Sequence, residues 1–454
     1  MDGEAARSET RRYGRSAFQL SAALGLAGVL TYVFFGLASH SLDSDEYGEV
    51  VILWTAVLLV AATLFRPIEH LLARTLAERR GTDERDTDAF RPAAIIQVGL
   101  CALTVVTVLA AKDPIQENLF SDEPGLYWAM LGALVGYSVA YFARGLLAGR
   151  TQFPLYAALL LIEALVRLAA VVLVAAGIMS GTLPIAVGIA LAPVAVLGVI
   201  PVALRRRGAQ AERQRKAEMP PELTLGSGGT FAAAVLVMML SEQLLINSGV
   251  LFVRASEGAA DAGFIFNVLM VARAPLVLFV AVAASLLPHL ARLRARGDET
   301  SAEAFRSSLS TTVMGVAAFA AATTLGVLAV GPQVMQLAFG DQFDYDRLGL
   351  AIVAVGMGMY LTAVSVNQAV LAHGLALRAA LPWLGSALLF AVLNLWQPLS
   401  PFRTVELAFT VSAGMLAVGL YAVYATADRK AGQTVSRGPG AEVETKLAAI
   451  DEVG

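Results

Sequence analysis

Charge, cysteine and histidine are all scarce in this sequence. Of its 454 residues 15% are charged and 57% are hydrophobic, whereas a soluble globular chain usually carries about 25% charged residues. The single cysteine, Cys101, excludes an intramolecular disulfide, and the four histidines are too dispersed to form a zinc-ligand pattern. A chain this apolar has the lipid bilayer as its main solvent.

Motifs for nucleotide hydrolysis and for metal catalysis are missing as well. There is no G-x-x-x-x-G-K-[ST] phosphate loop and no H-E-x-x-H pair. The acidic turn Asp-Ser-Asp-Glu at 43–46 resembles what a membrane glycosyltransferase needs, but the outer loops are too short to form a catalytic domain. Negative charge before a helix also stabilises the N-terminal end of the helix dipole. We therefore expect a helix cap at 43–46, and we predict no enzymatic activity, catalytic residue, metal, cofactor or nucleic-acid partner.

Apolar runs long enough to cross a bilayer dominate the chain. A helix needs about 20 apolar residues to span the hydrocarbon core, and windows of that length indicate about twelve spans. The first run is followed by no small-residue cleavage pattern, so we expect a membrane span rather than a cleaved signal. The predicted fold is all-α and integral to the membrane, with spans at 17–39, 48–71, 92–111, 125–147, 154–177, 183–204, 227–253, 263–287, 307–330, 348–372, 377–396 and 404–426.

Basic residues set the predicted orientation. Arginine and lysine gather in alternate loops and in both tails, whereas the opposite loops hold only Lys112, Arg254, Arg347 and Arg403. Cytoplasmic loops attract positive charge. We therefore predict that both termini are cytoplasmic (N-in/C-in), and that the polar tail 428–454 is disordered.

The two halves of the sequence show a weak internal repeat. Glu46-Tyr47-Gly48 aligns with Asp261-Ala262-Gly263, and 71–74 aligns with 286–289, without a gap. The alternative is a chance likeness between two apolar helices. A repeat of six helices would place the halves about an axis along the membrane normal, with the lobes meeting along helices 1, 2, 7 and 8. The predicted units are a cytoplasmic N-terminus at 1–16, an N-lobe at 17–204, a basic cytoplasmic linker at 205–226, a C-lobe at 227–427 and the tail at 428–454.

Four segments carry a family resemblance. They are the arginine-bearing end of the second span, LDSDEYGEVV at 42–51, RGLLAGRTQFPLYAALLLIEALVRL at 144–168 and LLPHLARLRAR at 286–296. Together they resemble the polysaccharide-transport (oligosaccharide flippase) branch of the multidrug/oligosaccharidyl-lipid/polysaccharide exporter superfamily. The resemblance covers most of the chain. Some members of this superfamily have two further helices, which this chain lacks.

The resemblance implies two six-helix lobes that form a V-shaped cavity. It also implies export of a lipid-linked glycan by alternating access in the bacterial inner membrane. The partners expected from it are a polyprenyl-linked glycan, the lipid bilayer and enzymes of envelope glycan assembly.

Two arginines within the spans are the first candidates for substrate binding. Ionisable side chains cost on the order of 2.5–3.5 kcal/mol at the centre of a spanning helix, and they persist where they face a cavity or a partner. Arg66 precedes Pro67, and a proline at this position bends a helix. The Arg66 side chain either contacts an anionic headgroup, extends to the membrane interface or pairs with Glu69. Arg273 lies too deep to snorkel, and its planar guanidinium suits a phosphate.

Further candidates are ionisable or amide side chains on the fifth and seventh spans. Glu163 and Arg167 are four residues apart on one helix face, so they form an intrahelical ion pair or Arg167 contacts substrate. Glu242, accompanied by Asn247, has no local cation. It is either a carboxylate for a coupling ion or the partner of Arg273, and the partner role is slightly favoured.

Four functions remain open on these residues. The first is a flippase for a polyprenyl-(di)phosphate-linked oligosaccharide in cell-envelope polysaccharide synthesis. The second is a cation-coupled exporter of small molecules of the multidrug type, with Glu242 or Glu163 as the ion site. A membrane enzyme of glycan assembly and a non-transporting scaffold are the third and fourth.

Overall fold

The computed structural model describes residues 2–78, 86–195, 197–198, 225–296 and 299–436. These residues form helices and the turns that connect them, with no strand among them. The helices are α1 (Asp2–Ser41), α2 (Ser44–Leu64), α3 (Arg66–Glu78), α4 (Asp86–Ala110), α5 (Lys112–Phe120), α6 (Pro124–Gly149), α7 (Phe153–Ala175), α8 (Leu183–Leu191), the 3₁₀-helix η1 (Ala192–Ala195), α11 (Leu225–Ser256), α12 (Ala259–Arg296), α13 (Glu299–Phe339), α14 (Arg347–Ala372), α15 (Ala376–Trp396) and α16 (Pro401–Ser436).

The helices are long and apolar enough for a multi-pass membrane protein. Among the described residues, 10 helices have the length and composition to cross a bilayer. The predicted spans fall on helices in the order expected from the sequence. The sixth, 183–204, begins with α8 and η1, and its end lies outside the described residues, as does most of the linker at 205–226.

Helix extends beyond two of the predicted spans. Helix α1 begins at Asp2, so the predicted N-terminal segment 1–16 and the first span share one helix, and the cytoplasmic location of that segment stays a prediction. Helix α16 continues to Ser436, and Arg306 of α13 forms an ion pair of 3.0 Å with Asp428. The first part of the predicted disordered tail is therefore helical, because its start packs against a neighbour. The remainder, 437–454, lies outside the described residues.

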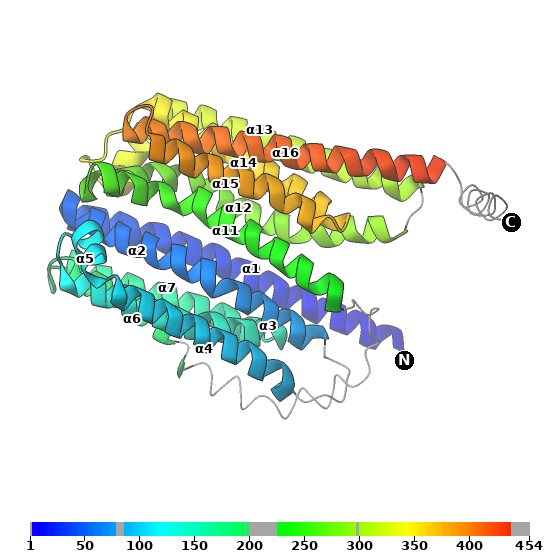
Figure 1. The fold of residues 1–454 in the computed structure, drawn as a ribbon, viewed down its shortest axis with the longest axis horizontal. Coiled ribbons are helices and arrows are strands. Elements are labelled where there is room, and N and C mark those ends of the chain that lie inside the picture. Colours follow the sequence, from blue (N-terminus) through cyan, green and yellow to red (C-terminus); the bar gives the residue numbers. More distant parts are fainter. Residues whose placement is uncertain (1, 79–85, 196, 199–224, 297–298, 437–454) are drawn as a thin grey trace.

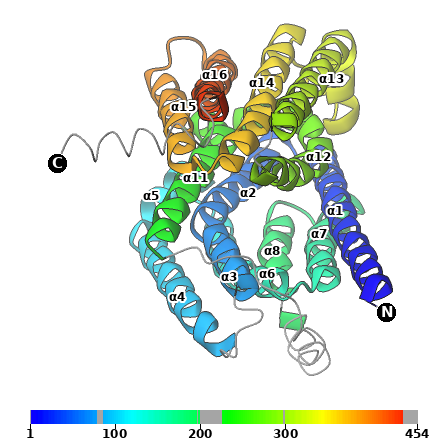
Figure 2. The same cartoon turned by 90° about the vertical axis from the view of Figure 1, so that its right-hand side faces the viewer.

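The helices form two lobes (Figures 1 and 2). In the N-lobe, α1 packs on α7, and α6 contacts α3 and α8. In the C-lobe, α14 packs between α13 and α16, and α11 packs on α15. The lobes meet where α2 contacts α11 and α12, and where α1 contacts α12 and α13. The predicted meeting of the first two helices of each half is thus present, with α13 as an additional contact of α1.

The two ends of the bundle differ. At one end, which we call the turn end, a short turn joins α1 to α2. The opposite end, the terminal end, holds the start of α1 and the end of α16 (Figure 1). At the turn end the Asp43 side chain accepts a hydrogen bond of 2.8 Å from the Glu46 backbone N–H and caps α2. The predicted helix cap is confirmed.

Candidate functional site

A break in the second span positions the first candidate arginine. Helix α2 ends at Leu64 and α3 begins at Arg66. Pro67 has no N–H to donate to the preceding turn, which accounts for the interruption. Arg66 and His70 lie on α3, and the charge of each interacts with Glu242 of α11.

Glu242 lies at the lobe interface and faces groups from both lobes. Its carboxylate accepts a hydrogen bond of 2.6 Å from the hydroxyl of Tyr360 on α14, a residue that is 1% exposed. The cation whose charge interacts with it from the N-lobe is Arg66. The prediction that Glu242 partners Arg273 stays a prediction: no ion pair joins these two described residues, but both interact with the Tyr360 hydroxyl. Arg66 and Glu242 belong to different lobes, so their electrostatic interaction cannot be read from the sequence.

Arg273 on α12 has an incompletely satisfied guanidinium. Its Nη1 donates a long hydrogen bond of 3.4 Å to Oδ1 of Asn247, whose amide in turn donates to Gln243 at 2.8 Å. The Nη2 atom is buried without a hydrogen-bond partner. Among the described residues, the titratable groups that interact with the Arg273 charge are the hydroxyls of Tyr32 and Tyr360, not a carboxylate. Arg273 thus retains a donor and a positive charge at the interface of the lobes.

Inside the N-lobe the predicted pairing of Glu163 is also corrected. Glu163 on α7 forms a buried ion pair with Arg144 of α6 rather than with Arg167, four residues along its own helix. Arg167 donates a hydrogen bond of 2.9 Å to the Tyr137 hydroxyl, and its guanidinium lies 4.7 Å from the ring centroid of Trp54. The close packing of α6 against α7 supplies Glu163 with a better partner than its own helix does.

Glu69 is a further buried ionisable residue of the N-lobe, and it interacts with both Arg144 and Arg66. Its carboxylate is 6% exposed and accepts a hydrogen bond of 2.6 Å from the hydroxyl of Tyr156 on α7. Its charge also interacts with Arg144 and Arg66. The predicted Arg66–Glu69 pairing is therefore a shared electrostatic interaction rather than a direct ion pair.

Contacts at the turn end close the interface between the lobes. Arg254 at the end of α11 reaches the N-lobe, where it donates to the carbonyls of Asn118 and Leu119 at 3.1 and 3.2 Å and to the Ser121 hydroxyl at 2.9 Å. It thereby caps the C-terminal end of α5, where a cation is favoured by the helix dipole. Gln342 after α13 donates to the Ser39 carbonyl at 2.9 Å.

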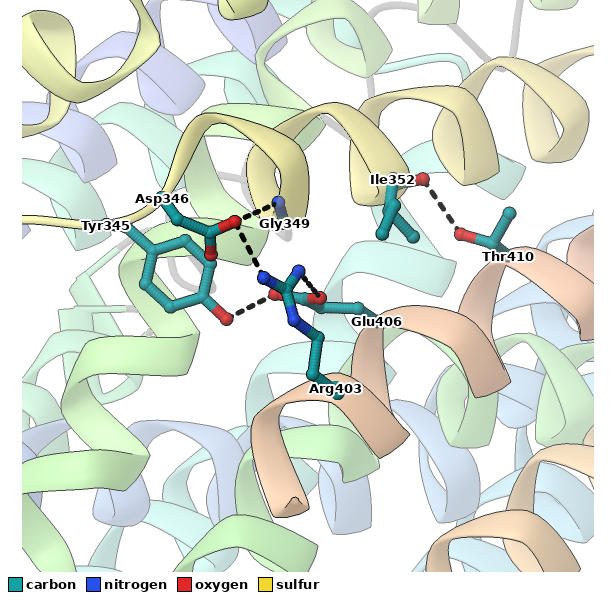
Figure 3. Close-up of polar contacts among 7 residues, drawn as sticks. All are labelled: Tyr345, Asp346, Gly349, Ile352, Arg403, Glu406 and Thr410. Carbon is teal, nitrogen blue, oxygen red and sulfur yellow. Dashed lines mark hydrogen bonds and ion pairs between the residues drawn. The ribbon is translucent and has the colours of Figure 1, made fainter. Parts of the chain in front are cut away.

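A polar cluster in the C-lobe holds the loop that carries Gln342. Figure 3 shows Arg403 of α16 between two carboxylates, at 2.7 Å from Asp346 and 2.8 Å from Glu406, while Tyr345 donates to Glu406. Burial of Asp346 opposes its ionisation, but the hydrogen bonds from Arg403 and from the Gly349 N–H outweigh burial and lower the pKa of Asp346. The cluster fixes the start of α14 to the start of α16.

Several residues of these sites were not singled out from the sequence. Arg144 and the hydroxyls of Tyr32, Tyr137, Tyr156 and Tyr360 are not among the candidates predicted from the sequence. A tyrosine in an apolar span needs a partner for its hydroxyl, and that signal would have marked all four. Among the described residues no cluster of histidine, cysteine, aspartate and glutamate could hold a metal ion.

The sequence is distantly similar to uncharacterized mycobacterial proteins. No protein-family model matches it. The uncharacterized protein Rv3630 of Mycobacterium tuberculosis is 23% identical over 414 residues, which cover 90% of this chain and 91% of that protein. At this identity the relative supplies no function.

Solved structures resemble the chain over nearly its whole length. The structure described as the inward-facing conformation of a multidrug resistance MATE family transporter of the MOP superfamily superposes with a TM-score of 0.66 at 11% identity. It covers 92% of this chain and 99% of that one. An outward-facing conformation of such a transporter gives a TM-score of 0.59 at 10% identity, over 93% of this chain and 96% of that one. The chain therefore has the fold of the MATE transporters of the MOP superfamily.

Proposed function

We propose that the protein exports a polyprenyl-(di)phosphate-linked oligosaccharide across the bacterial inner membrane by alternating access, for synthesis of a cell-envelope polysaccharide. Both termini lie in the cytoplasm, and the enzymes that assemble the envelope glycan are the expected partners. Arg273 at the lobe interface holds the phosphate, while the polyprenyl chain stays in lipid and the sugar passes between the lobes. The protein is a transporter rather than an enzyme.

The incompletely satisfied guanidinium of Arg273 is the observation that carries this proposal. A buried cation without a carboxylate is costly, and a phosphate oxygen would supply both the missing charge and the missing acceptor. Arg273 lies 14 residues into α12, which is about 21 Å from the turn end at 1.5 Å per residue. Transporter substrate sites tend to lie near the bilayer midplane. Asn247 and Tyr32 place further polar groups beside it.

The conformation, closed at one end of the bundle, is one of the two that alternating access requires. Most hydrogen bonds between described residues of the two lobes lie toward the turn end, at Arg254, Gln342 and Tyr47, and one lies deeper, from the Tyr32 hydroxyl to the Met270 carbonyl. With cytoplasmic termini, this closed end is the external one.

Substitution of Arg273 tests the proposal. Arg273→Ala should abolish surface glycan in the producing bacterium, and Arg273→Lys should restore only part of it, because an ammonium keeps the charge but loses the planar pair of donors. Expression and thermal unfolding are measured for every variant. Arg347→Ala is the matched control, since Arg347 is an exposed arginine at the start of α14. Normal glycan export by a stably folded Arg273→Ala protein would contradict the proposal.

A cation-coupled small-molecule exporter is the second candidate, and Glu242 favours it. Glu242 is a carboxylate at the lobe interface, and the structures with this fold include multidrug resistance transporters. If this candidate is correct, Glu242→Gln should abolish efflux of a cationic dye from intact cells, while Arg273→Ala should leave efflux unchanged. Loss of surface glycan without any change in dye efflux would exclude it.

A further inference from the structure

Among the described residues, seven charged side chains are linked by an ion pair, by hydrogen bonds or by electrostatic interaction, from the N-lobe interior to the C-lobe. Arg66 interacts with both Glu242 and Glu69. Glu69 interacts with Arg144, which forms the ion pair with Glu163. At the N-lobe end, Arg167 donates a hydrogen bond to the Tyr137 hydroxyl, which also interacts with Glu163. At the C-lobe end, the Tyr360 hydroxyl interacts with both Glu242 and Arg273. The network consists of Arg66, Glu69, Arg144, Glu163, Arg167, Glu242 and Arg273.

The network carries one surplus positive charge when His70 is counted as neutral. It holds four arginines and three glutamates. Its N-lobe members are three arginines and two glutamates, so they carry one excess positive charge. Arg66 is the N-lobe arginine whose charge interacts with Glu242 across the interface. The C-lobe cation that remains is Arg273, which interacts with tyrosine hydroxyls and an asparagine. The surplus charge and the unpartnered Nη2 atom therefore coincide at one residue.

Charge balance restricts the ligand that such a site accepts. In a low-dielectric environment an uncompensated charge of either sign is unfavourable, so the best ligand brings one negative charge. A phosphodiester between a polyprenol and a sugar carries one negative charge, whereas a diphosphate in the same position carries two. The second charge of a diphosphate would meet Glu242 at the interface without a further cation.

We infer that the transported lipid carries its sugar on a single phosphate rather than on a diphosphate. This inference rests on the proposed function and narrows its substrate class to polyprenyl-monophosphate-linked sugars. Arg273 holds the phosphodiester through Nη2. Arg66 remains paired with Glu242 and does not bind a second phosphate. Glu242 acts as the specificity-determining residue, because its charge cancels that of the second arginine at the interface.

Two short-chain lipids that differ by one phosphate test the inference. The full chain is purified into nanodiscs, and the binding of farnesyl-phosphate-glucose and farnesyl-diphosphate-glucose is measured by calorimetry. The monophosphate should bind more tightly, by roughly tenfold or more. Glu242→Gln raises the surplus to two positive charges and should reverse the preference. Glu257→Gln is the matched control, since Glu257 is exposed just beyond α11, and it should leave the preference unchanged.

A double variant keeps the test valid if Glu242→Gln fails to fold. Arg66→Gln with Glu242→Gln restores a single surplus charge and should prefer the monophosphate, as the unsubstituted protein does. Tighter binding of the diphosphate by the unsubstituted protein would overturn the inference and leave the proposed function intact. Failure of both lipids to bind a folded protein would overturn the proposed function together with the inference.

Discussion

Gly48 of α2 and Gly263 of α12 lie against each other where the two lobes meet. A Cβ atom added to Gly263 would approach the Gly48 Cα to 3.1 Å, and a Cβ added to Gly48 would overlap the carbonyl group of Ala259. These two glycines are also the residues that the internal repeat aligns. Residues related by a twofold axis contact each other only when they lie near that axis. The contact therefore supports an axis that passes between α2 and α12.

A side chain at Gly48 should force the lobes apart at the turn end. Gly48→Ala inserts a methyl group into the Ala259 backbone, and overpacking of this kind costs about 1–3 kcal/mol. Thermal unfolding of the purified protein should show a lower Tm than the unsubstituted chain. Gly25→Ala is the control, because a Cβ at Gly25 meets no atom within 4 Å. An equal Tm for the two variants would show that the contact between the lobes is looser than described.

Arg254 should stabilise the conformation in which the turn end is closed. Ser44 and Gln342, whose side chains are 3.4 Å apart across the interface, are replaced by cysteine in a Cys101→Ala background. A short bifunctional thiol reagent should link them efficiently in the parent protein, since the 3.4 Å distance joins side-chain ends and not the Cβ atoms that a disulfide requires to be close. Arg254→Ala removes the three hydrogen bonds to the end of α5 and its turn, so the yield of the link should fall several-fold.

The control for this experiment removes the same charge from the same end of the bundle. Arg347→Ala should leave the yield of the link unchanged. Arg254→Lys should give an intermediate yield, since an ammonium still favours a helix C-terminus but offers no fork of donors. A link that forms equally well in all variants would refute the role of Arg254 in closure.

The Arg144–Glu163 pair should be structural rather than part of transport. Removal of one partner of a buried ion pair typically costs about 3–5 kcal/mol, because the other charge remains buried and unpaired. Arg144→Ala should accordingly lower the stability of the protein in denaturant titrations by about that amount. Arg144→Met combined with Glu163→Leu should recover most of the loss. Stability of Arg144→Ala equal to that of the parent would indicate that Glu163 finds another cation.

The proposed orientation is tested with single cysteines and a membrane-impermeant thiol reagent. Cysteines at Ser121 and Ser256, at the turn end, should react in intact cells. Cysteines at Gln210, which lies outside the described residues, and at Thr434 should react only after permeabilisation. All are placed in the Cys101→Ala background. Labelling of Gln210→Cys in intact cells would reverse the orientation.

The spans were predictable because lipid imposes one simple requirement on each of them, an apolar run of sufficient length. The partners of the charged residues were not predictable to the same degree. From the sequence, Arg167 is the visible neighbour of Glu163, and only the packing of α6 on α7 brings Arg144 closer. Likewise the interaction of Glu242 with Arg66 depends on how the two lobes pack. The cluster around Arg403 joins residues more than fifty positions apart, which no periodicity reveals.

The position of the lobe contacts has a mechanical consequence. Arg254, Gln342 and the two glycines all lie at one end of long helices, so that end acts as a pivot with a long lever arm. Helix α13 has 41 residues, which corresponds to about 60 Å at 1.5 Å per residue. A rotation of about 10° at the pivot would carry the far end of such a helix through about 10 Å. Small rearrangements of a few side chains at the turn end are thereby converted into a large change in aperture at the terminal end.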